Sequence, residues 1–451
     1  LILCSKKYKK VKRTKKIVSD IKQMPKTQPK QLCLVDSIIP DEPPIISFTG
    51  QGNCTYNKTV DMCMSKPQHK LKVNLWRNAG MTVVHGSNCT HLACVYSCFS
   101  KNKIPHTYVS QVPGMNSFTY KPMLYSSLKN DPIIPQSYML PRDAKKLELD
   151  SKIYDGYYIK KPVGGARGEG IRLFKDLAEI DLTKSQVVQR YEEFLLINGH
   201  KFDLRIYLLI TNIDPLTVYF HKEGIARFAS RFYQQPNSSN YKDKKMHLTN
   251  FAVNSVNKKI ATFDNQENKQ KLSTVLQYLD DQKILRKKDF YDKLKKTLES
   301  VFTKVHKNML HLGRNADQSF PTKYFGYYGA DVAITKDNKL KLIEINLGPA
   351  LASDNPLDFD VKNTMMKQAF ELIGFRAERF VFDPKKADLA KFKKWFSDQT
   401  VEEKRVLMQQ VDETLRQGDW VKLDFKGLGG KFNKLVEKSK KEILKEVMKR
   451  K

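Results

Sequence analysis

Residues 329–347 read GADVAITKDNKLKLIEINL, and this stretch gives the clearest indication of the fold. Two apolar runs flank the short polar linker KDNK. Such a linker between apolar runs is typical of a hairpin loop, so we expect two antiparallel strands here. Because side chains two residues apart lie on the same face of a strand, Glu344 and Asn346 share a face. Antiparallel pairing can then place Asp331 opposite them.

These three side chains offer the hard oxygen ligands that Mg²⁺ prefers, namely two carboxylates and an amide. The alternative is a solvated polar edge, which the spacing alone would indicate. The strand around Glu344 is apolar, however, and an unpaired acid in an apolar strand is energetically costly. The pattern therefore predicts a metal site at Asp331, Glu344 and Asn346, of the kind that also contacts nucleotide phosphates.

A glycine-rich loop, KPVGGARGEGI, occupies residues 161–171 and follows a predicted strand. Glycines allow backbone N–H groups to approach a phosphate closely, and Lys161 and Arg167 add positive charge. Most such loops are only turns, and this one matches neither a Walker loop nor a dinucleotide fingerprint. Together with a separate carboxylate cluster, it indicates nucleotide binding between two lobes.

Charged residues alternate with apolar ones where the next strand begins. Lys201, Asp203 and Arg205 share one strand face, which favours a cleft, although a solvent-facing strand is the alternative. Arg227 follows a Glu-Gly pair and could bind a carboxylate through its two-pronged guanidinium. An ordinary surface arginine is the other interpretation of Arg227.

The composition describes a globular chain with an unusual charge. Of 451 residues, 80 are Lys or Arg and 48 are Asp or Glu, which leaves a net charge of +32. Such an excess attracts polyanions, whether nucleic acid, anionic lipid or acidic polypeptide. No apolar run approaches the length of about 18 residues that a membrane span needs.

All seven cysteines lie in the first 98 residues. We expect free thiols in a reducing compartment, and a disulfide-stapled secreted module is the alternative.

Four parts are expected along the chain: a basic flexible arm and linker (1–46), an N-terminal domain (47–140), a catalytic region (141–384) and a basic helical tail (385–451). Strand-like runs alternate with turns in the catalytic region, which indicates a mixed α/β fold. The expected strands are 157–160, 186–189, 204–211, 216–220, 330–335 and 340–345. Apolar residues spaced along one face predict a helix over 290–312.

Over roughly residues 74–423 the chain resembles the tubulin tyrosine ligase-like family, whose catalytic core is an ATP-grasp fold. Residues 412–418 look like the end of the core in its polyglutamylase-like branch. The motifs keep the family's order and are PGM at 113–115, PQSYMLP at 135–141, and the segments 161–171, 189–192, 201–207, 223–228, 247–250 and 344–349. The resemblance implies an α/β (α+β) chain built as an ATP-grasp fold, with a small N-terminal domain and a basic helical C-terminal tail.

In this family, ATP phosphorylates an acceptor carboxylate, and the amine of a free amino acid displaces the phosphate. The resemblance implies phosphate contacts from Lys161, Arg167, Gly168 and Lys201. It implies an adenine site lined by Gln189, Arg190, Tyr191 and Glu192, and further ATP contacts from Asp203, Thr249 and Asn250. Mg²⁺ would bind Asp331, Glu344 and Asn346. Arg205 and Arg227 would orient carboxylates or the acylphosphate, and Lys362 would meet the carboxylate of the incoming amino acid.

The resemblance leaves the added amino acid open. The run NFAVNS at 250–255 lacks a hydroxyl pair and a lysine that the family has near the incoming amino acid. Residues 348–350 read Gly-Pro-Ala in place of the usual Ser-Pro-Ser, and a tyrosine at 157 or 158 replaces a tryptophan. We expect a glutamylase. A glycylase or tyrosine ligase on the same fold and a catalytically decayed microtubule- or polyanion-binding protein are the alternatives.

The expected partners are tubulin C-terminal tails or microtubules and a free amino acid, in the cytoplasm and cytoskeleton, with the cilium or basal body as candidate sites. Neither a membrane nor nucleic acid is expected. The aromatic residues are not interleaved with the basic arm, and no recognition motif for nucleic acid occurs.

The tail gives a prediction about binding. Residues 385–451 carry 19 Lys or Arg against 11 acids. One helical stripe is apolar and consists of Phe432, Leu435, Val436, Ile443, Leu444, Val447 and Met448. If the lysines attract an acidic polymer, replacing Lys438, Lys440, Lys441 and Lys445 by Ser should weaken microtubule binding. The effect should be greatest at low salt, because exposed charges are screened within about 10 Å at 0.1 M. Co-sedimentation that is unchanged at low salt would leave the tail a structural helix with a solvated face.

Overall fold

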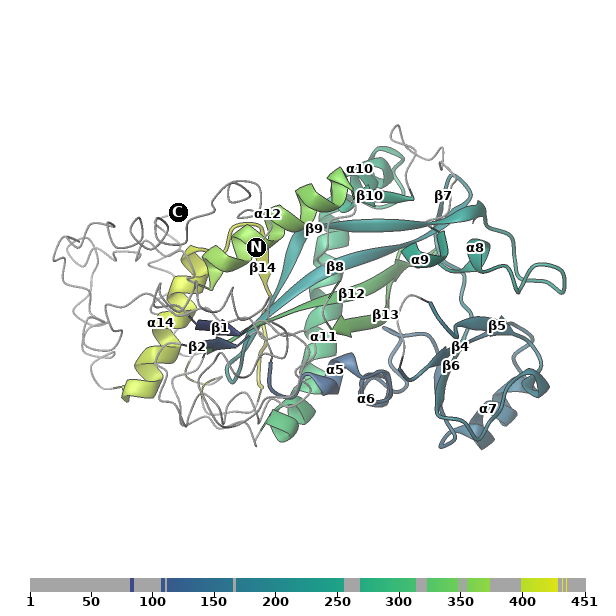
Figure 1. Cartoon of the computed structure of the whole chain (residues 1–451), viewed down its shortest axis with the longest axis horizontal. Coiled ribbons are helices and arrows are strands. Elements are labelled where there is room, and N and C mark those ends of the chain that lie inside the picture. The colour runs from purple at the N-terminus through teal and green to yellow at the C-terminus, as the bar shows by residue number, and fades with distance from the viewer. Residues whose placement is uncertain are drawn as a thin grey trace, which may run out of the picture.

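Figure 1 shows the computed structural model of the chain. It describes residues 82–84, 107–109, 112–164, 168–254, 268–313, 323–347, 349, 355–373, 399–428, 432 and 435. The expected basic arm, Arg167 and most of the apolar tail stripe lie outside these residues. The described residues form a mixed α/β structure, as expected. Among their helices, none combines the length and apolarity that crossing a bilayer requires.

The largest element is a seven-stranded sheet in which all paired strands are antiparallel. Its strands run in the order β10-β9-β8-β12-β13, with β14 also paired to β9 and β7 to β8. They are β7 (Leu196–Ile197), β8 (His200–Ile213), β9 (Leu216–Phe232), β10 (Lys269–Lys271), β12 (Gly326–Ile334), β13 (Leu340–Leu347) and β14 (Trp420–Lys422). The hairpin predicted from residues 329–347 is confirmed as β12 and β13.

One face of this sheet packs on four helices. Alternate residues of β8, such as Phe202, Leu204 and Ile206, join a continuous apolar core with them. These helices are α5 (Asn116–Thr119), α6 (Lys121–Ser127), α10 (Leu272–Asp281) and α11 (Lys287–Gly313). α11 confirms the expected helix and extends it by a few residues at its start. α5 and α6 fall inside the expected N-terminal domain, yet they share one core with the sheet.

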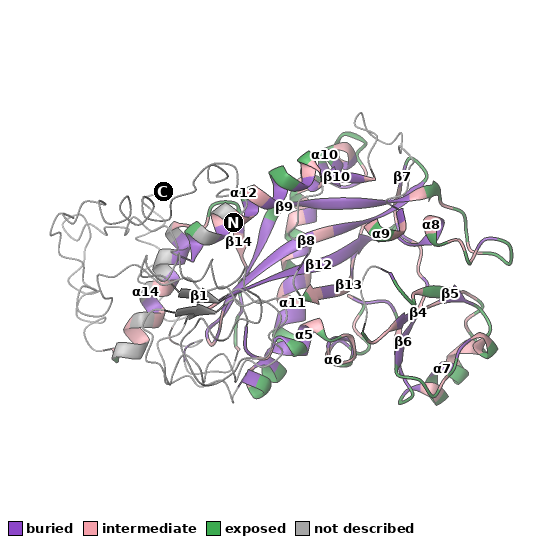
Figure 2. Ribbon diagram, viewed as in Figure 1, coloured by how far each residue is buried: buried purple, intermediate pink, exposed green. Residues whose placement is uncertain are grey.

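The opposite face changes character along β8. Its residues are charged from Lys201 to Arg205 and then become apolar with Tyr207 and Leu209. The apolar part packs against α12 (Pro356–Leu372) and belongs to a second core. Figure 2 shows that the long strands are buried over most of their length.

A smaller lobe lies beside that charged part (Figure 1). It holds a four-stranded antiparallel sheet in the order β3-β6-β4-β5 and the helix α7 (Ala144–Ser151). The strands are β3 (Ser137–Leu140), β4 (Tyr158–Pro162), β5 (Arg172–Phe174) and β6 (Gln186–Arg190). A separate parallel sheet joins β1 (Thr82–Val84), β2 (Thr107–Val109) and β11 (Lys323–Tyr324).

The C-terminal part departs from the expected helical tail. α14 (Val401–Leu415) is helical, but Trp420–Lys422 form β14, so the prediction is wrong over these residues. β14 pairs with β9, with Trp420 opposite His221, and the Trp420 side chain is fully buried. Burial of a large aromatic side chain and backbone pairing outweigh helix propensity here. A strand of three residues is too short to show a sequence period.

Glu413 anchors α14 to the sheet. Its buried carboxylate accepts hydrogen bonds from Thr211 Oγ1 at 2.9 Å and from the Tyr219 hydroxyl at 2.8 Å. Gln409 Nε2 donates to the second carboxylate oxygen at 2.7 Å. Two strands and a helix thus depend on one acceptor.

Replacing Glu413 by Leu should lower the free energy of unfolding by about 2–4 kcal/mol, because the Thr211 and Tyr219 hydroxyls would lose their buried acceptor. Chemical denaturation would measure the change. As a matched control, Glu371→Ala alters an exposed acid on α12 and should change the free energy by less than about 0.5 kcal/mol. Equal stability of Glu413→Leu and the wild type would contradict this role of Glu413.

Candidate active site

The hairpin places the predicted metal residues together. Asp331 is directly opposite Glu344, and Gly329 is opposite Asn346, with a register shift just after Asp331. The Asn346 amide Nδ2 lies 3.2 Å from Asp331 Oδ2 and donates to it. The expectation that antiparallel pairing brings these side chains to one place is confirmed.

Four charged residues of alternating sign form a row across β8, β9 and β12. Arg205 Nε donates to Asp331 Oδ1 at 2.5 Å. Arg227 bridges two acids, with NH2 2.9 Å from Asp331 Oδ2 and Nε 2.7 Å from Asp203 Oδ1. Thr249 Oγ1 also donates to Asp203, at 2.7 Å. The strand register sets this order, since Asp203 is paired with Arg227 and Asp331 with Arg205.

The row changes the ionisation of its central members. Burial alone would raise the pKa of the Asp331 carboxyl, but the Arg205 and Arg227 guanidinium groups outweigh it and hold that pKa well below its usual range. Burial opposes the charged form of Arg227, and Asp203 and Asp331 together raise the pKa of Arg227 well above its usual value. Asp331 and Arg227 are therefore both charged at neutral pH.

Lys161 on β4 faces this row from the small lobe. Its Nζ donates to Gln189 Oε1 on β6 at 2.6 Å, and Gln189 Nε2 donates to Ser137 Oγ at 2.8 Å. Burial lowers the pKa of Lys161 to about 8, against the opposing effect of Glu344. Lys201 on β8 is similar, because burial lowers its pKa to about 7, with Asp203 opposing the shift.

A cleft that is open to solvent lies between the two sheets. Its walls come from both lobes and include Lys161, Gln189, Arg190, Tyr191, Glu192, Lys201, Asp203, Thr249, Asn250, Asp331 and Glu344. Every one of these residues was predicted from the sequence. The cleft combines buried cations with carboxylates.

Two of the lining residues have side chains committed elsewhere. The Arg190 guanidinium pairs with Asp150 on α7, with Nε 3.0 Å from Oδ2, and stacks over the Tyr154 ring. Glu192 pairs with Lys341 at 3.2 Å. Their side-chain charges are therefore already matched by protein groups.

The remaining predicted residues lie around the cleft. Gly168 has φ +80°, and an added Cβ would come within 3.1 Å of Asn250 Oδ1, so this position favours glycine. Arg205, Arg227 and Asn346 stand behind Asp331 and contact it. Arg167 lies outside the described residues.

Lys362 belongs to a separate buried cluster next to the charged row. Its Nζ is 3.3 Å from Asp358 Oδ2 on the same helix, and Lys269 Nζ on β10 is 2.8 Å from the same oxygen. Lys269 is the cross-strand partner of Arg227, so this cluster extends the charged face by one strand.

Sequence reasoning missed Lys269 and Lys121. Lys121 on α6 pairs with Glu344, with Nζ 3.3 Å from Oε2, although the two residues lie far apart in the chain. No local period or motif spacing signals such a contact. Only the packing of α6 against the main core shows it.

The donor set suits Mg²⁺ only in part. No group of three or more His, Cys, Asp or Glu side chains within the described ranges could hold a metal ion by itself. Asp331, Glu344 and the Asn346 amide oxygen nevertheless give hard oxygen donors from the paired strands β12 and β13. Magnesium commonly takes one or two carboxylates and completes its shell with phosphate oxygens and water. These residues therefore fit a magnesium ion that arrives with a phosphate ligand.

Comparison with known proteins defines the family. The model of the Tubulin-tyrosine ligase family matches residues 99–382, more than half of the chain. The chain belongs to the Tubulin-tyrosine ligase family. The site residues from Lys161 to Lys362 all fall within the matched region.

The names of similar proteins support the assignment to this family. The mouse tubulin polyglutamylase TTLL5 is 33% identical over 286 residues, which cover 59% of this chain and 21% of the relative. The human tubulin polyglutamylase TTLL6 is 32% identical and covers 60% of this chain and 31% of the relative. A probable beta-tubulin polyglutamylase of Tetrahymena thermophila is 31% identical, covering 60% and 24%. The chain thus matches between a fifth and a third of these relatives' length.

The two lowered lysine pKa values predict proton uptake on binding of an anion such as magnesium–ADP. At about pH 6 both ammonium groups are already protonated, so uptake should be near zero. At about pH 8.5 much of each amine is neutral, and an anion that favours the charged form raises both pKa values and draws protons from the buffer.

Calorimetry in two buffers of different ionisation enthalpy would measure this uptake. Lys201→Met should reduce the uptake at the higher pH without abolishing it, because Lys161 remains. Equal uptake by the wild-type protein at both pH values would contradict the assignment of these lysines to an anion site.

Proposed function

We propose that the protein is an ATP-dependent carboxylate–amine ligase that adds glutamate to glutamate side chains of tubulin tails. The observation that carries this proposal is the cleft itself. Two buried lysines, Lys161 and Lys201, lie in its walls together with the carboxylates Asp331 and Glu344. Cations that can hold phosphate and oxygen ligands that can hold a metal, gathered in one cleft, are what phosphoryl transfer from a nucleotide needs.

We propose an ATP-grasp arrangement for the two lobes. A four-stranded antiparallel sheet and a larger antiparallel sheet enclose the cleft, which supports nucleotide binding between them. Adenine would lie against Gln189 and the segment from Arg190 to Glu192. Lys161, Arg167, Gly168 and Lys201 would hold the phosphates, and Asp203, Thr249 and Asn250 would complete the ATP contacts.

Magnesium held by Asp331, Glu344 and Asn346 would supply neutralisation of negative charge on the phosphates. Arg205 and Arg227 fix Asp331 from behind and so keep its carboxylate ionised and oriented. Lys121 supplies a positive charge next to Glu344 from α6. Most of the acceleration of phosphoryl transfer comes from such positioning and charge.

The reaction has two balanced steps. An oxygen of the acceptor carboxylate attacks the γ-phosphorus of ATP, and ADP leaves, which forms an acylphosphate. The amine of the free amino acid then attacks the acyl carbon, phosphate leaves, and the nitrogen releases a proton as the amide forms. By resemblance to the family, Arg205 and Arg227 would orient the anionic groups, and Lys362 would receive the carboxylate of the free amino acid.

Glutamate is the preferred donor because the relatives are named polyglutamylases. Tubulin tails or microtubules are the proposed acceptors, and the charge of +32 supports an acidic partner.

We propose the cytoplasm and cytoskeleton as the location, with the cilium or basal body as specific sites. We also propose that residues 47–140 contribute the N-terminal domain and that 141–384 hold most of the catalytic region.

Incubation with tubulin, ATP and radiolabelled glutamate, glycine or tyrosine tests the proposal. Label from glutamate alone should enter tubulin. Label from glycine or tyrosine would identify the other ligase on this fold, and ATP binding without incorporation of any label would identify a decayed enzyme.

Glu344→Gln should abolish incorporation while the protein stays folded, because the change removes one charged oxygen ligand of magnesium. Asp337→Asn is the matched control, since it makes the same carboxylate-to-amide change at the exposed turn of the same hairpin. Asp337→Asn should retain activity close to wild type. Near wild-type turnover in Glu344→Gln would remove the metal assignment.

A further inference from the structure

The Lys201 ammonium depends on a single hydroxyl. Lys201 is only 9% exposed, and it makes no ion pair with a carboxylate in the part of the chain that the structure describes. Its Nζ donates to the Tyr191 hydroxyl at 2.7 Å and lies 4.2 Å from the centre of the same ring. The position of this buried cation is therefore set largely by where the Tyr191 hydroxyl is held.

A second hydrogen bond holds that hydroxyl. The Tyr191 oxygen lies 3.2 Å from His247 Nδ1, and His247 Nε2 lies 3.1 Å from the Asn240 carbonyl oxygen. A carbonyl only accepts, so Nε2 must carry the proton and Nδ1 must accept from Tyr191. Burial and the nearby Lys201 ammonium lower the pKa of His247 to about 4, which keeps the imidazole neutral and able to accept. Every donor in this chain therefore points away from Lys201.

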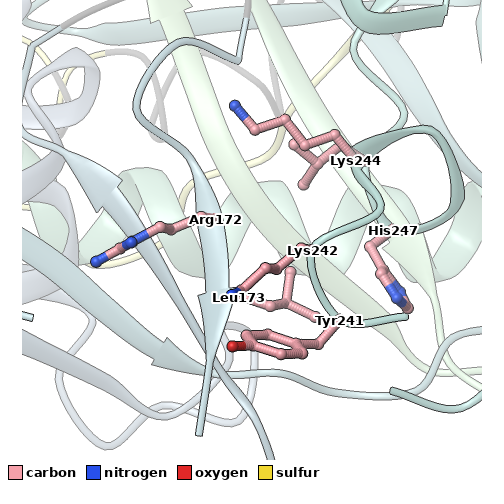
Figure 3. Close-up of a pocket in the computed structure, with 7 residues that line it drawn as sticks. Arg172, Leu173, Tyr241, Lys242, Lys244 and His247 are labelled. Carbon is pink, nitrogen blue, oxygen red and sulfur yellow. The ribbon is translucent and has the colours of Figure 1, made fainter. Parts of the chain in front are cut away.

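Packing and a further hydrogen bond hold His247 and Asn240, at the end of this hydrogen-bond chain. The His247 ring meets the rings of Tyr191 and Tyr233 edge-on, at centroid distances of 5.7 Å and 5.8 Å. The Asn240 side chain ties its own loop, since Nδ2 donates to the Gln235 carbonyl at 2.9 Å. Figure 3 shows that His247 also lines a small hollow that includes Arg172 and Tyr241. His247 thus connects the loop after β9 to the wall of the main cleft.

We propose that Tyr191 and His247 are positioning residues, which form a one-directional hydrogen-bond chain from Lys201 to the Asn240 carbonyl and aim the ammonium at the nucleotide phosphates. This inference rests on the proposed nucleotide-dependent function. The Tyr191 hydroxyl gives the ammonium a neutral acceptor, so this hydrogen bond adds no negative charge that would repel phosphate.

Two effects should follow when the hydroxyl alone is removed. Tyr191→Phe keeps the ring under Lys201 and should weaken binding of magnesium–ADP about tenfold, because a hydrogen bond to a charged group is lost. It should also move the pH at which affinity begins to fall to lower values, because the buried ammonium becomes less stable without its acceptor. The charged and titratable groups around Lys201 and its partner Tyr191 are Lys161, Glu193, Asp203, Tyr233 and His247, and this variant leaves all five in place.

Tyr241→Phe is the matched control. It removes a hydroxyl that lies next to Asn240, in the loop after β9, but donates to Glu179 Oε2 at 3.1 Å instead of contacting Lys201. Magnesium–ADP affinity and its pH profile should be unchanged. A purely structural role of Tyr191 would change affinity without moving the pH at which it falls, and that outcome would overturn the proposal.

A pair of variants at His247 gives an independent test. His247→Asn retains an oxygen that can accept from Tyr191 and should bind magnesium–ADP more tightly than His247→Leu, which offers no acceptor. Equal affinities of the two would also overturn the proposal. If wild-type protein itself fails to bind magnesium–ADP, the proposed function is at fault. If the wild type binds and Tyr191→Phe binds equally well, only the positioning role is lost.

Discussion

The row Asp203–Arg227–Asp331–Arg205 is the interaction on which the whole site depends. Its members come from three neighbouring strands, so the row exists only while β8, β9 and β12 keep their register. Each charge is largely shielded from solvent and is matched by the next. Removing one partner from such an arrangement leaves an uncompensated buried charge, which is strongly destabilising. The strand pairing that builds the core therefore also fixes the ionisation of the site.

This row has its place because one sheet face divides into two regions. Toward α12 the face is apolar, with Tyr207 and Leu209 in a buried core, and toward the small lobe it is charged. Gly329 stands near the border between them. A Cβ there would come within 2.8 Å of the Arg205 side chain, which must cross this position to reach Asp331. This position therefore favours glycine, because a side chain would displace Arg205.

Much of this arrangement follows from strand periodicity. The period of two in residues 329–347 is enough to place Asp331, Glu344 and Asn346 on one face, and the same rule groups Lys201, Asp203 and Arg205. The long helix was equally readable from local pattern. The motif resemblance contributed most of the cleft lining, including Gln189 and Thr249, which no period indicates.

What the sequence did not show arises from packing between distant segments. Lys121 meets Glu344 only because α6 packs against the main core, and Lys269 meets Asp358 because α12 crosses β10. The direction of the hydrogen bonds from Lys201 depends on a backbone carbonyl at Asn240, whose position no side-chain pattern encodes. β14 was not predicted because a strand of three residues is too short to show an alternation of apolar and polar side chains. Contacts of this kind need the assembled fold.

The pairing of β14 with β9 places a limit on where the folded unit ends. β10 and β14 cover different parts of β9, at Ile225–Arg227 and at Tyr219–His221. A chain cut after residue 384 would lose β14 and uncover both the backbone edge of β9 and the pocket filled by Trp420. Exposed strand edges next to apolar side chains invite pairing with other chains and aggregation. The smallest soluble unit should therefore extend through Leu423, whose backbone N–H still bonds to Val218.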